Sequence, residues 1–175
     1  MNYLQNYSTE RLFIRPLEKS DCYLWDSYFE NNENLKFLNL NNELTNAEKS
    51  VQWIDNQIRR YNNNLYGLMA LFLKDTNVLI GQCGLLTQEL EGRLQLEIGY
   101  HIKPEYWHQG FATEAAKFFK QLAFDHKLSE EIISIINIDN IGSQKVARNN
   151  GMTVSKQIIY KSMPVYIYST HIETS

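Results

Sequence analysis

Residues Leu94–Ala123, LQLEIGYHIKPEYWHQGFATEAAKFFKQLA, contain the pattern that decides the fold. An apolar strand pattern is interrupted at Pro104, and a turn around Gly110 then leads into a segment of strong helix formers. A strand that passes through a glycine turn into a helix leaves several backbone N–H groups without partners at the helix start. These groups and the helix dipole favour a phosphate or a pyrophosphate. The stretch therefore predicts a phosphorylated ligand lying across the end of a strand.

The rest of the chain predicts strands and helices in mixed order. Strands are expected at residues 11–16, 66–74, 78–87, 94–102, 131–137, 155–160 and 165–171, and helices after Ser20 and Asp21, after the Thr45–Glu48 capping box, after Gly110 and over 143–149. Glu131–Asn137, EIISIIN, is typical of a central strand covered on both faces. No linker or repeat is visible, so we expect one domain over residues 1–175. The Gly110 helix should connect parallel neighbours through a right-handed crossover.

Composition and charge exclude several classes of function. The formal net charge of −3 gives no basic surplus for binding nucleic acid. Cys22 and Cys83 lack metal or disulfide spacing and are expected to be free core thiols. His101 and His108 have no spaced partners, so no metal site is predicted. The N-terminus lacks a signal-peptide core, and no apolar run approaches the ~20 residues of a membrane span. We expect a cytoplasmic protein.

Two local motifs resemble those of the GNAT superfamily of acetyl-CoA-dependent N-acetyltransferases, and more narrowly of the branch that contains ribosomal-protein N-terminal acetyltransferases. In Glu97–Ala115, EIGYHIKPEYWHQGFATEA, Gly110 and Ala112 fill the small positions of the family's pyrophosphate loop, while Trp107 replaces its Gln or Arg. The second motif is Asn-x-x-Ser at Asn140–Ser143, followed by VARNNGM. The resemblance covers nearly the whole chain. It implies an α/β (α+β) fold, with a mixed, largely antiparallel twisted sheet of about seven strands, helices on both faces and splayed central parallel strands.

The resemblance also implies acetyl-CoA as co-substrate and no metal. It assigns the pyrophosphate to backbone amides of the loop, namely His108, Gln109, Gly110, Phe111, Ala112 and Thr113. It places Tyr100, His101 and Ile102 along the pantetheine arm, with backbone groups of Tyr100 and Ile102 making the contacts. Those contacts require a splayed strand edge, because a fully paired strand has no backbone groups to offer. The Asn140 side chain is expected on the same arm; the alternative is a simple helix cap.

Transfer of an acetyl group to an amine requires a base, a donor to the oxyanion and a group that assists the leaving thiolate. Glu97, between apolar neighbours, is the preferred base, directly or through water; the alternative is an exposed strand Glu paired with Lys or Arg. A backbone N–H near Ile102 would meet the oxyanion. Ser143 is the candidate for the sulfur, because Ala147 stands where many relatives have a Tyr. The alternative for Ser143 is a first-turn cap.

We therefore expect an N-acetyltransferase that acts by direct transfer in a ternary complex on a primary amine, either a protein N-terminal α-amine or a small molecule. Residues 31–46, the first helices and the final hairpin should select the acceptor. Arg59-Arg60 is interpreted as a solvated helix end. A homodimer through C-terminal edge strands is possible. A non-catalytic CoA-binding or sensor module on the same fold remains the alternative, whereas a nucleotide-binding enzyme lacks its glycine-rich motifs.

Overall fold

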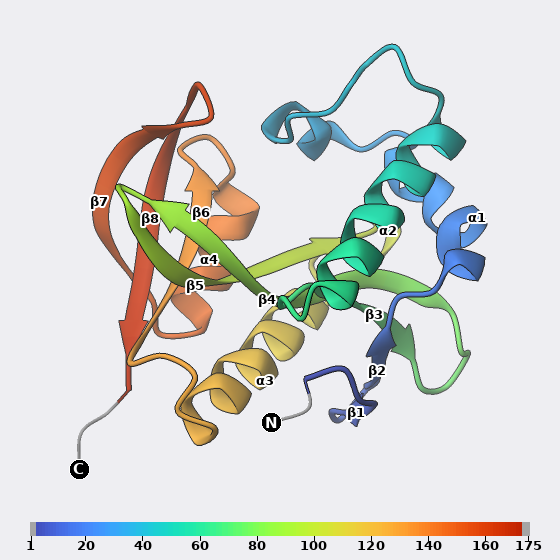
Figure 1. Ribbon diagram of the computed structural model, residues 1–175. Helices are drawn as coiled ribbons and strands as arrows, with labels where there is room; N and C mark the ends of the chain where they lie inside the picture. The colour runs from blue at the N-terminus through green and yellow to red at the C-terminus, as the bar shows by residue number, and fades with distance from the viewer. Residues whose placement is uncertain (1–2, 173–175) are drawn as a thin grey trace.

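The computed structural model describes residues 3–172 (Figure 1). Its strands are β1 (Tyr7–Ser8), β2 (Leu12–Pro16), β3 (Leu68–Leu73), β4 (Leu79–Leu90), β5 (Arg93–Ile102), β6 (Glu131–Asn137), β7 (Thr153–Tyr160) and β8 (Met163–His171). The α-helices are α1 (Cys22–Trp25), α2 (Asn46–Asn62), α3 (Phe111–Asp125) and α4 (Ile141–Asn149). Short 3-10 helices lie at Lys19–Asp21, Asp26–Phe29, Glu33–Phe37 and Pro104–Tyr106.

The eight strands form one sheet in the order β1-β2-β3-β4-β5-β6-β8-β7. Every neighbouring pair is antiparallel except β5 and β6, which are parallel and connected through α3. The predicted mixed, largely antiparallel sheet is therefore confirmed. The additional strand is β1, whose two residues pair with Ile14 and Phe13 of β2. Two residues are too few to show a period-two pattern, so no local pattern predicts this strand.

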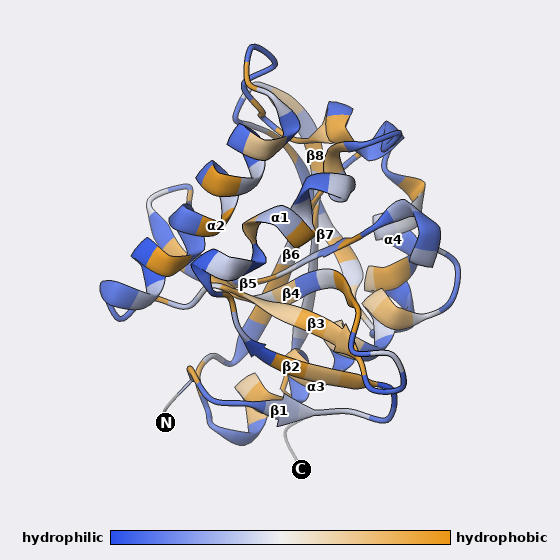
Figure 2. Ribbon diagram, turned by 90° about the vertical axis from the view of Figure 1, so that its right-hand side faces the viewer, coloured by the Kyte–Doolittle hydropathy of each residue, from blue (hydrophilic) through white to orange (hydrophobic). Residues whose placement is uncertain are grey.

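Helices cover both faces of the sheet, as predicted. In β3, Met69 and Leu71 join the core cluster that contains α3, whereas Ala70 and Phe72 join the cluster beneath α1 and α2. Successive strand residues point to opposite faces, so a strand that is apolar throughout must be covered twice. Figure 2 shows hydrophobic colour concentrated on the central strands and hydrophilic colour on the loops and outer helix turns.

The helix that follows Gly110 packs on the sheet through small and aromatic residues. Its buried positions are Phe111, Ala115, Ala116, Phe119 and Ala123, whereas Ala112 is only half-buried. Alanines spaced by three and four residues place a flat strip on one helix face. This strip lets the helix lie close to β4 and β5.

Helix starts agree with the prediction at α2, agree in part at α1 and differ at α4. The Thr45–Glu48 capping box is present at α2. Before α1, the capping box is instead formed by Glu18 with Asp21, whose buried carboxylate also accepts from Arg15. Asp21 is the N-cap residue of α1, as predicted, but its side chain makes no cap bond there, and Ser20 is not the N-cap. Helix α4 begins two residues before Ser143. Several neighbouring polar residues could cap such a helix, and the local backbone geometry decides which of them does.

The two edges of β5 are paired to very different extents. Along β4, register pairs run from Gly81↔Ile102 to Leu90↔Arg93, ten in all. Along β6 there are two, Leu96↔Ile132 and Glu97↔Ile133. The strands separate beyond Glu97. The splayed parallel pair expected from the sequence is therefore present at the centre of the sheet.

Candidate active site

The backbone groups of β5 alternate between its two edges. The amide of Lys103 donates to the carbonyl oxygen of Ile80 on the β4 side at 2.9 Å. In an antiparallel ladder, hydrogen-bonded and non-hydrogen-bonded pairs alternate. The backbone groups of His101 therefore face β4 as well, whereas those of Tyr100 and Ile102 face the opposite edge. That edge has no strand neighbour within residues 3–172 after the two pairs with β6.

Two side chains hydrogen-bond to carbonyls of this open edge and agree with the alternation. Ser134 Oγ of β6 donates to the carbonyl oxygen of Ile98 at 3.0 Å. Trp107 Nε1 donates to the carbonyl oxygen of Ile102 at 2.7 Å. The amide of Ile102 and both backbone groups of Tyr100 lie on the same edge, where a ligand with amide groups could pair with them. Ser134 was not predicted, although it is the one polar residue inside an apolar run.

The side chain of His101 lies on the face of the sheet that α1 and α2 cover, among aromatic rings. Its Nδ1 is 3.1 Å from the hydroxyl of Tyr28, and its ring meets that of Trp53 edge-on with centroids 4.8 Å apart. Burial lowers the pKa of His101 to about 4, so the ring is neutral at pH 7. The structure therefore brings Tyr100 and Ile102 to the open edge and does not bring His101 there.

The start of α3 offers free backbone amides next to this edge. Gly110 is the N-cap residue with φ +84°, and it provides no side-chain cap. The first hydrogen bond of the helix runs from the amide of Glu114 to the carbonyl oxygen of Gly110 at 3.0 Å. The amides of Phe111, Ala112 and Thr113 therefore have no partner within the helix. With the helix dipole, they form an electropositive surface suited to an anion.

An ion-pair network between α3 and the residues just before β2 fixes the glycine turn. The Arg11 side chain pairs with Glu114 at 2.7 Å and donates to the carbonyl oxygen of Gln109 at 2.9 Å. Thr9 Oγ1 donates to the same carboxylate at 2.6 Å. Partial burial would raise the pKa of Glu114, but the hydrogen bonds from Thr9 and Arg11 outweigh it and hold this pKa below its usual value. His108 and Gln109 of the loop are exposed.

The start of α4 lies across the opening from β5. The hydroxyl of Tyr100 donates to the carbonyl oxygen of Ser143 at 2.8 Å. The amide of Ser143 in turn donates to Asn140 Oδ1 at 3.0 Å, so Asn140 is the N-cap of α4. The cap alternative for Asn140 therefore holds for Oδ1, while its side-chain NH2 has no hydrogen-bond partner within residues 3–172. Ala147, one turn further on, is 1% exposed and packed in the core.

Glu97 lies where β5 and β6 separate. Its Oε2 accepts from Gln88 Nε2 at 2.8 Å, and its Oε1 accepts from the amide of Ile135 at 3.3 Å. With 9% of its surface exposed, it is neither an exposed strand Glu nor a partner in an ion pair with Lys or Arg within residues 3–172. Burial raises its pKa, and the two hydrogen bonds and the charges of Lys161 and Arg60 oppose this without cancelling it.

Sequence reasoning missed the residues that hold Glu97 in place. Gln88 bridges two elements, because its Nε2 donates to Glu97 while its Oε1 accepts from the Tyr160 hydroxyl at 3.3 Å. Arg60 is half-buried, not solvated as expected: its Nε donates to the carbonyl oxygen of Tyr66 at 2.6 Å. These contacts join residues 6 to 72 positions apart, so no local pattern indicates them.

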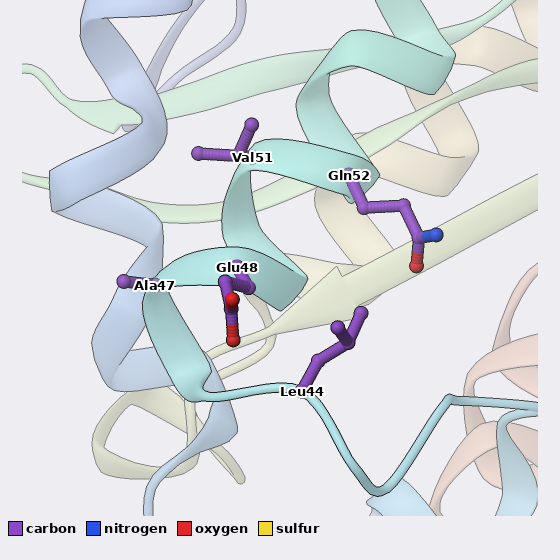
Figure 3. Close-up of a pocket in the computed structure, with 5 residues that line it drawn as sticks. All are labelled: Leu44, Ala47, Glu48, Val51 and Gln52. Atoms are coloured by element: carbon purple, nitrogen blue, oxygen red, sulfur yellow. The ribbon is translucent and has the colours of Figure 1, made fainter.

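Two surface hollows flank α2. One lies over Gln88, between the C-terminal half of α2, β4 and the tip of the β7–β8 hairpin. The other lies at the start of α2, where Leu44 points toward the helix and Ala47, Val51 and the stem of Gln52 complete an apolar lining (Figure 3). This second hollow contains none of the predicted site residues. Within residues 3–172 no cluster of three metal-ligating side chains occurs, and no helix is long and apolar enough to cross a membrane.

Comparison with known proteins identifies relatives of this architecture. The family model described as Acetyltransferase (GNAT) domain matches residues 11–153. The chain is 27% identical to the uncharacterized protein YkkB of Bacillus subtilis, over 96% of each chain, and 26% identical to the uncharacterized N-acetyltransferase YoaA of the same organism, over 90% of each.

Solved structures share the fold at low sequence identity. A putative ribosomal-protein-serine acetyltransferase from Vibrio cholerae superposes with a TM-score of 0.80 at 16% identity, covering 98% of this chain and 99% of that one. RimL, a ribosomal L7/L12 alpha-N-protein acetyltransferase in complex with coenzyme A, gives a TM-score of 0.80 at 17% identity, covering 96% and 98%.

Proposed function

The chain belongs to the GNAT acetyltransferase family, and from this premise we propose that it transfers the acetyl group of acetyl-CoA to a primary amine by direct attack in a ternary complex. The observation that carries the proposal is the position of Glu97. This buried carboxylate with a raised pKa lies where β5 leaves β6. The open edge that starts there leads toward the uncapped start of α3.

The chain's own groups fit coenzyme A. The free amides of Phe111, Ala112 and Thr113 suit its pyrophosphate, and Gly110 leaves the approach to them clear. A Cβ at Gly110 would meet only Arg11 Nη2, at 3.4 Å. The amide of Ile102 and the backbone groups of Tyr100 suit the amide-rich pantetheine arm. Bound there, acetyl-CoA would supply the acetyl group as a reactive thioester. His108 and Gln109 would contribute backbone amides at the exposed side of the turn.

Glu97 would take the proton that the acceptor ammonium must lose. An α-amino group, with a pKa near ~7.7–8.0, needs less help than a lysine-type amine at ~10.4. A carboxyl whose pKa is raised toward neutrality is a better base for this step than an ordinary one. The amide of Ile102, fixed by strand pairing on its other side, would donate to the oxygen that gains negative charge. The nitrogen–carbon bond forms, and the carbon–sulfur bond breaks.

Ser143 remains the candidate group for the departing thiolate. Its carbonyl accepts from Tyr100, which holds the start of α4 beside the open edge. Its hydroxyl has no hydrogen-bond partner in the part of the chain that the structure describes, and the residue is partly exposed, so the hydroxyl is free to donate. Ala147 presents no polar atom, and no other hydroxyl replaces it on that helix turn. Asn140 would reach the pantetheine arm with its NH2 group, because its oxygen caps α4.

The acceptor is proposed to be a protein N-terminal α-amine or a small-molecule amine. The likeness to RimL, a ribosomal L7/L12 alpha-N-protein acetyltransferase, supports the former by fold alone. We expect the protein to act in the cytoplasm, where acetyl-CoA and such acceptors meet. The edge strand β7 is the place at which a second copy could pair.

The test measures release of free thiol from acetyl-CoA with a panel of peptides and small amines, together with calorimetric titration of acetyl-CoA alone. Transfer to any amine, with loss of that transfer in Glu97→Gln, is the expected result. Tight binding without transfer to any acceptor would instead indicate a CoA-binding sensor. Absence of acetyl-CoA binding would refute the proposal altogether.

A further inference from the structure

The hollow over Gln88 is lined by cations and amides. It has a volume of about 420 Å³, and its charged residues are Arg59 and Arg60 from α2 and Lys161 from the tip of the β7–β8 hairpin. No carboxylate lines it in the part of the chain that the structure describes. Because the whole chain carries a formal net charge of −3, three cations around one hollow contrast with the rest of the molecule.

None of these three cations forms an ion pair with an acidic side chain within residues 3–172. Arg60 donates to the backbone carbonyls of Tyr66 and Thr87, so its guanidinium is held in place by neutral acceptors. Arg59 donates to the neutral side chain of Asn56, and Lys161 lies over the ring of Tyr160 at 5.1 Å. Burial lowers the pKa of Arg60, with the charge of Glu97 opposing this. A half-buried guanidinium without a carboxylate partner favours an incoming anion.

A second lysine on the β7–β8 hairpin differs from Lys161 because it has an acidic partner. Lys156 of β7 forms an ion pair with Glu91 at the β4–β5 turn. Its charge is therefore already compensated, whereas that of Lys161 is not.

The hollow borders the proposed base. Gln88 lines it and donates to Glu97 Oε2 at 2.8 Å. Arg60 and Lys161 are the two cations whose charges act on Glu97. An amine that approaches Glu97 from this side would carry its substituents into the hollow. The same positive charges disfavour an ammonium and favour the neutral amine that must attack.

We propose that the hollow formed by Arg59, Arg60 and Lys161 binds a carboxylate of the acceptor, so that the preferred substrates are primary amines that also carry a carboxylate. The inference rests on the proposed acetyl transfer and names its substrate class. A guanidinium fork binds a carboxylate through two parallel hydrogen bonds, which fixes orientation as well as position. The carboxylate enters the hollow, and the amine faces Glu97.

Matched acceptor pairs test this preference. They also show whether the carboxylate belongs to a small amino acid or to a side chain of a peptide. One pair is β-alanine and β-alaninamide, and the other is two amidated peptides that differ only in Glu or Gln at the second position. We expect kcat/KM for the acidic member to exceed that of the neutral member by about tenfold or more in at least one pair, which identifies the source. Equal values in both pairs, or preference for the neutral members, overturn the inference.

Two exposed cations can be removed without disturbing Arg60 and its backbone contacts. The double variant Arg59→Gln with Lys161→Asn should reduce the acidic preference to about threefold or less and leave KM for acetyl-CoA unchanged. Asn is chosen because residue 161 has φ +46°, a conformation that Asn tolerates. Lys156→Gln is the matched control and should keep the full preference. A double variant with unchanged preference overturns the assignment.

The failure of this inference differs from failure of the proposed function. Acetyl-CoA titrated without acceptor tests the latter alone. The protein could bind acetyl-CoA and still acetylate no member of either pair. In that case, calorimetry with CoA present compares the binding of the N-acetylated form of each acceptor. Equal or absent binding of the acidic products then overturns the inference while coenzyme binding stands.

Discussion

The two edges of β5 are paired very differently. Toward β4 the strand is paired over its whole length, and toward β6 it is paired only as far as Glu97. The paired edge fixes the strand as a rigid element. The open edge presents backbone groups that would be costly to bury without partners. An edge that is left open beside a rigid one is therefore a place for a ligand, provided that side chains satisfy the remaining groups.

The largest effect is expected from blocking the free amides at the start of α3, next to the open edge of β5. Gly110→Glu should abolish measurable acetyl-CoA binding, because a negative side chain would stand before the amides of Phe111 and Ala112. Isothermal calorimetry measures the loss. Gly92→Glu is the matched control, since Gly92 also has positive φ, +74°, and a Cβ there would meet nothing within 4 Å. Equal loss of binding in both variants would mean that strain, and not the anion site, is responsible.

The next largest effect is expected at Glu97, where β5 and β6 separate. Glu97→Gln should lower kcat by on the order of 10²–10⁴-fold, the contribution of a general base, with KM for acetyl-CoA little changed. In the parent protein, kcat/KM should rise with pH through the raised pKa of Glu97, and the variant should lose this rise. Steady-state rates between pH 5 and 9 measure both. Unchanged turnover would remove Glu97 from this role.

The same carboxyl gives a stability test whose sign is fixed. The folded chain binds the proton of Glu97 more tightly than the unfolded chain, because its pKa is raised. Stability from this group is therefore present below the ordinary Glu value and is lost as pH rises through the raised value. Urea unfolding should show that Glu97→Gln gains stability relative to the parent as pH rises. A variant whose stability falls relative to that of the parent as pH rises would contradict the raised pKa of Glu97.

A smaller effect is expected from the side chain that bridges the diverging strands. Ser134→Ala leaves the carbonyl of Ile98 without its partner and should cost about 1–3 kcal/mol of unfolding free energy, the penalty for an unsatisfied buried group. Urea denaturation measures it. Ser50→Ala is the control, because the Ser50 hydroxyl is equally buried and has no partner. A comparable loss in both variants would show that the bridge adds nothing.

The smallest effect concerns the far end of the open edge. Trp107→Phe keeps an aromatic ring against the turn but removes the N–H that binds the carbonyl of Ile102. The Kd for acetyl-CoA should rise about two- to tenfold, in line with one net hydrogen bond of ~0.5–1.5 kcal/mol. Tyr106→Phe in the same turn should leave Kd unchanged. An unaltered Kd in Trp107→Phe would show that the turn does not depend on this bond.

Local patterns were sufficient for most of the fold. Alternating and continuous apolar runs located seven strands, and the Thr45–Glu48 box located the start of α2. They failed where a segment was too short, as at β1, or where several polar residues compete for one cap, as around Asp21. The site was predicted where one residue type decides the backbone, as at Gly110. The roles assigned to the predicted site residues remain predictions.

The residues that complete the site could not be found in the same way. Gln88, Tyr160, Arg60 and Ser134 are ordinary in their local sequence and become informative only through partners far along the chain. His101 shows the converse, because strand alternation turns its backbone groups toward β4 and away from the open edge.

The sequence alone determined which segments are strands and helices and which glycine bends the chain into α3, because these depend on side-chain period and on backbone conformations that only certain residues adopt. Only the tertiary structure decided that β6 leaves β5 at Glu97, that this carboxyl is buried, and that three unpaired cations gather beside it. Such properties arise from the distances between distant segments and from the exclusion of water, which no local pattern encodes.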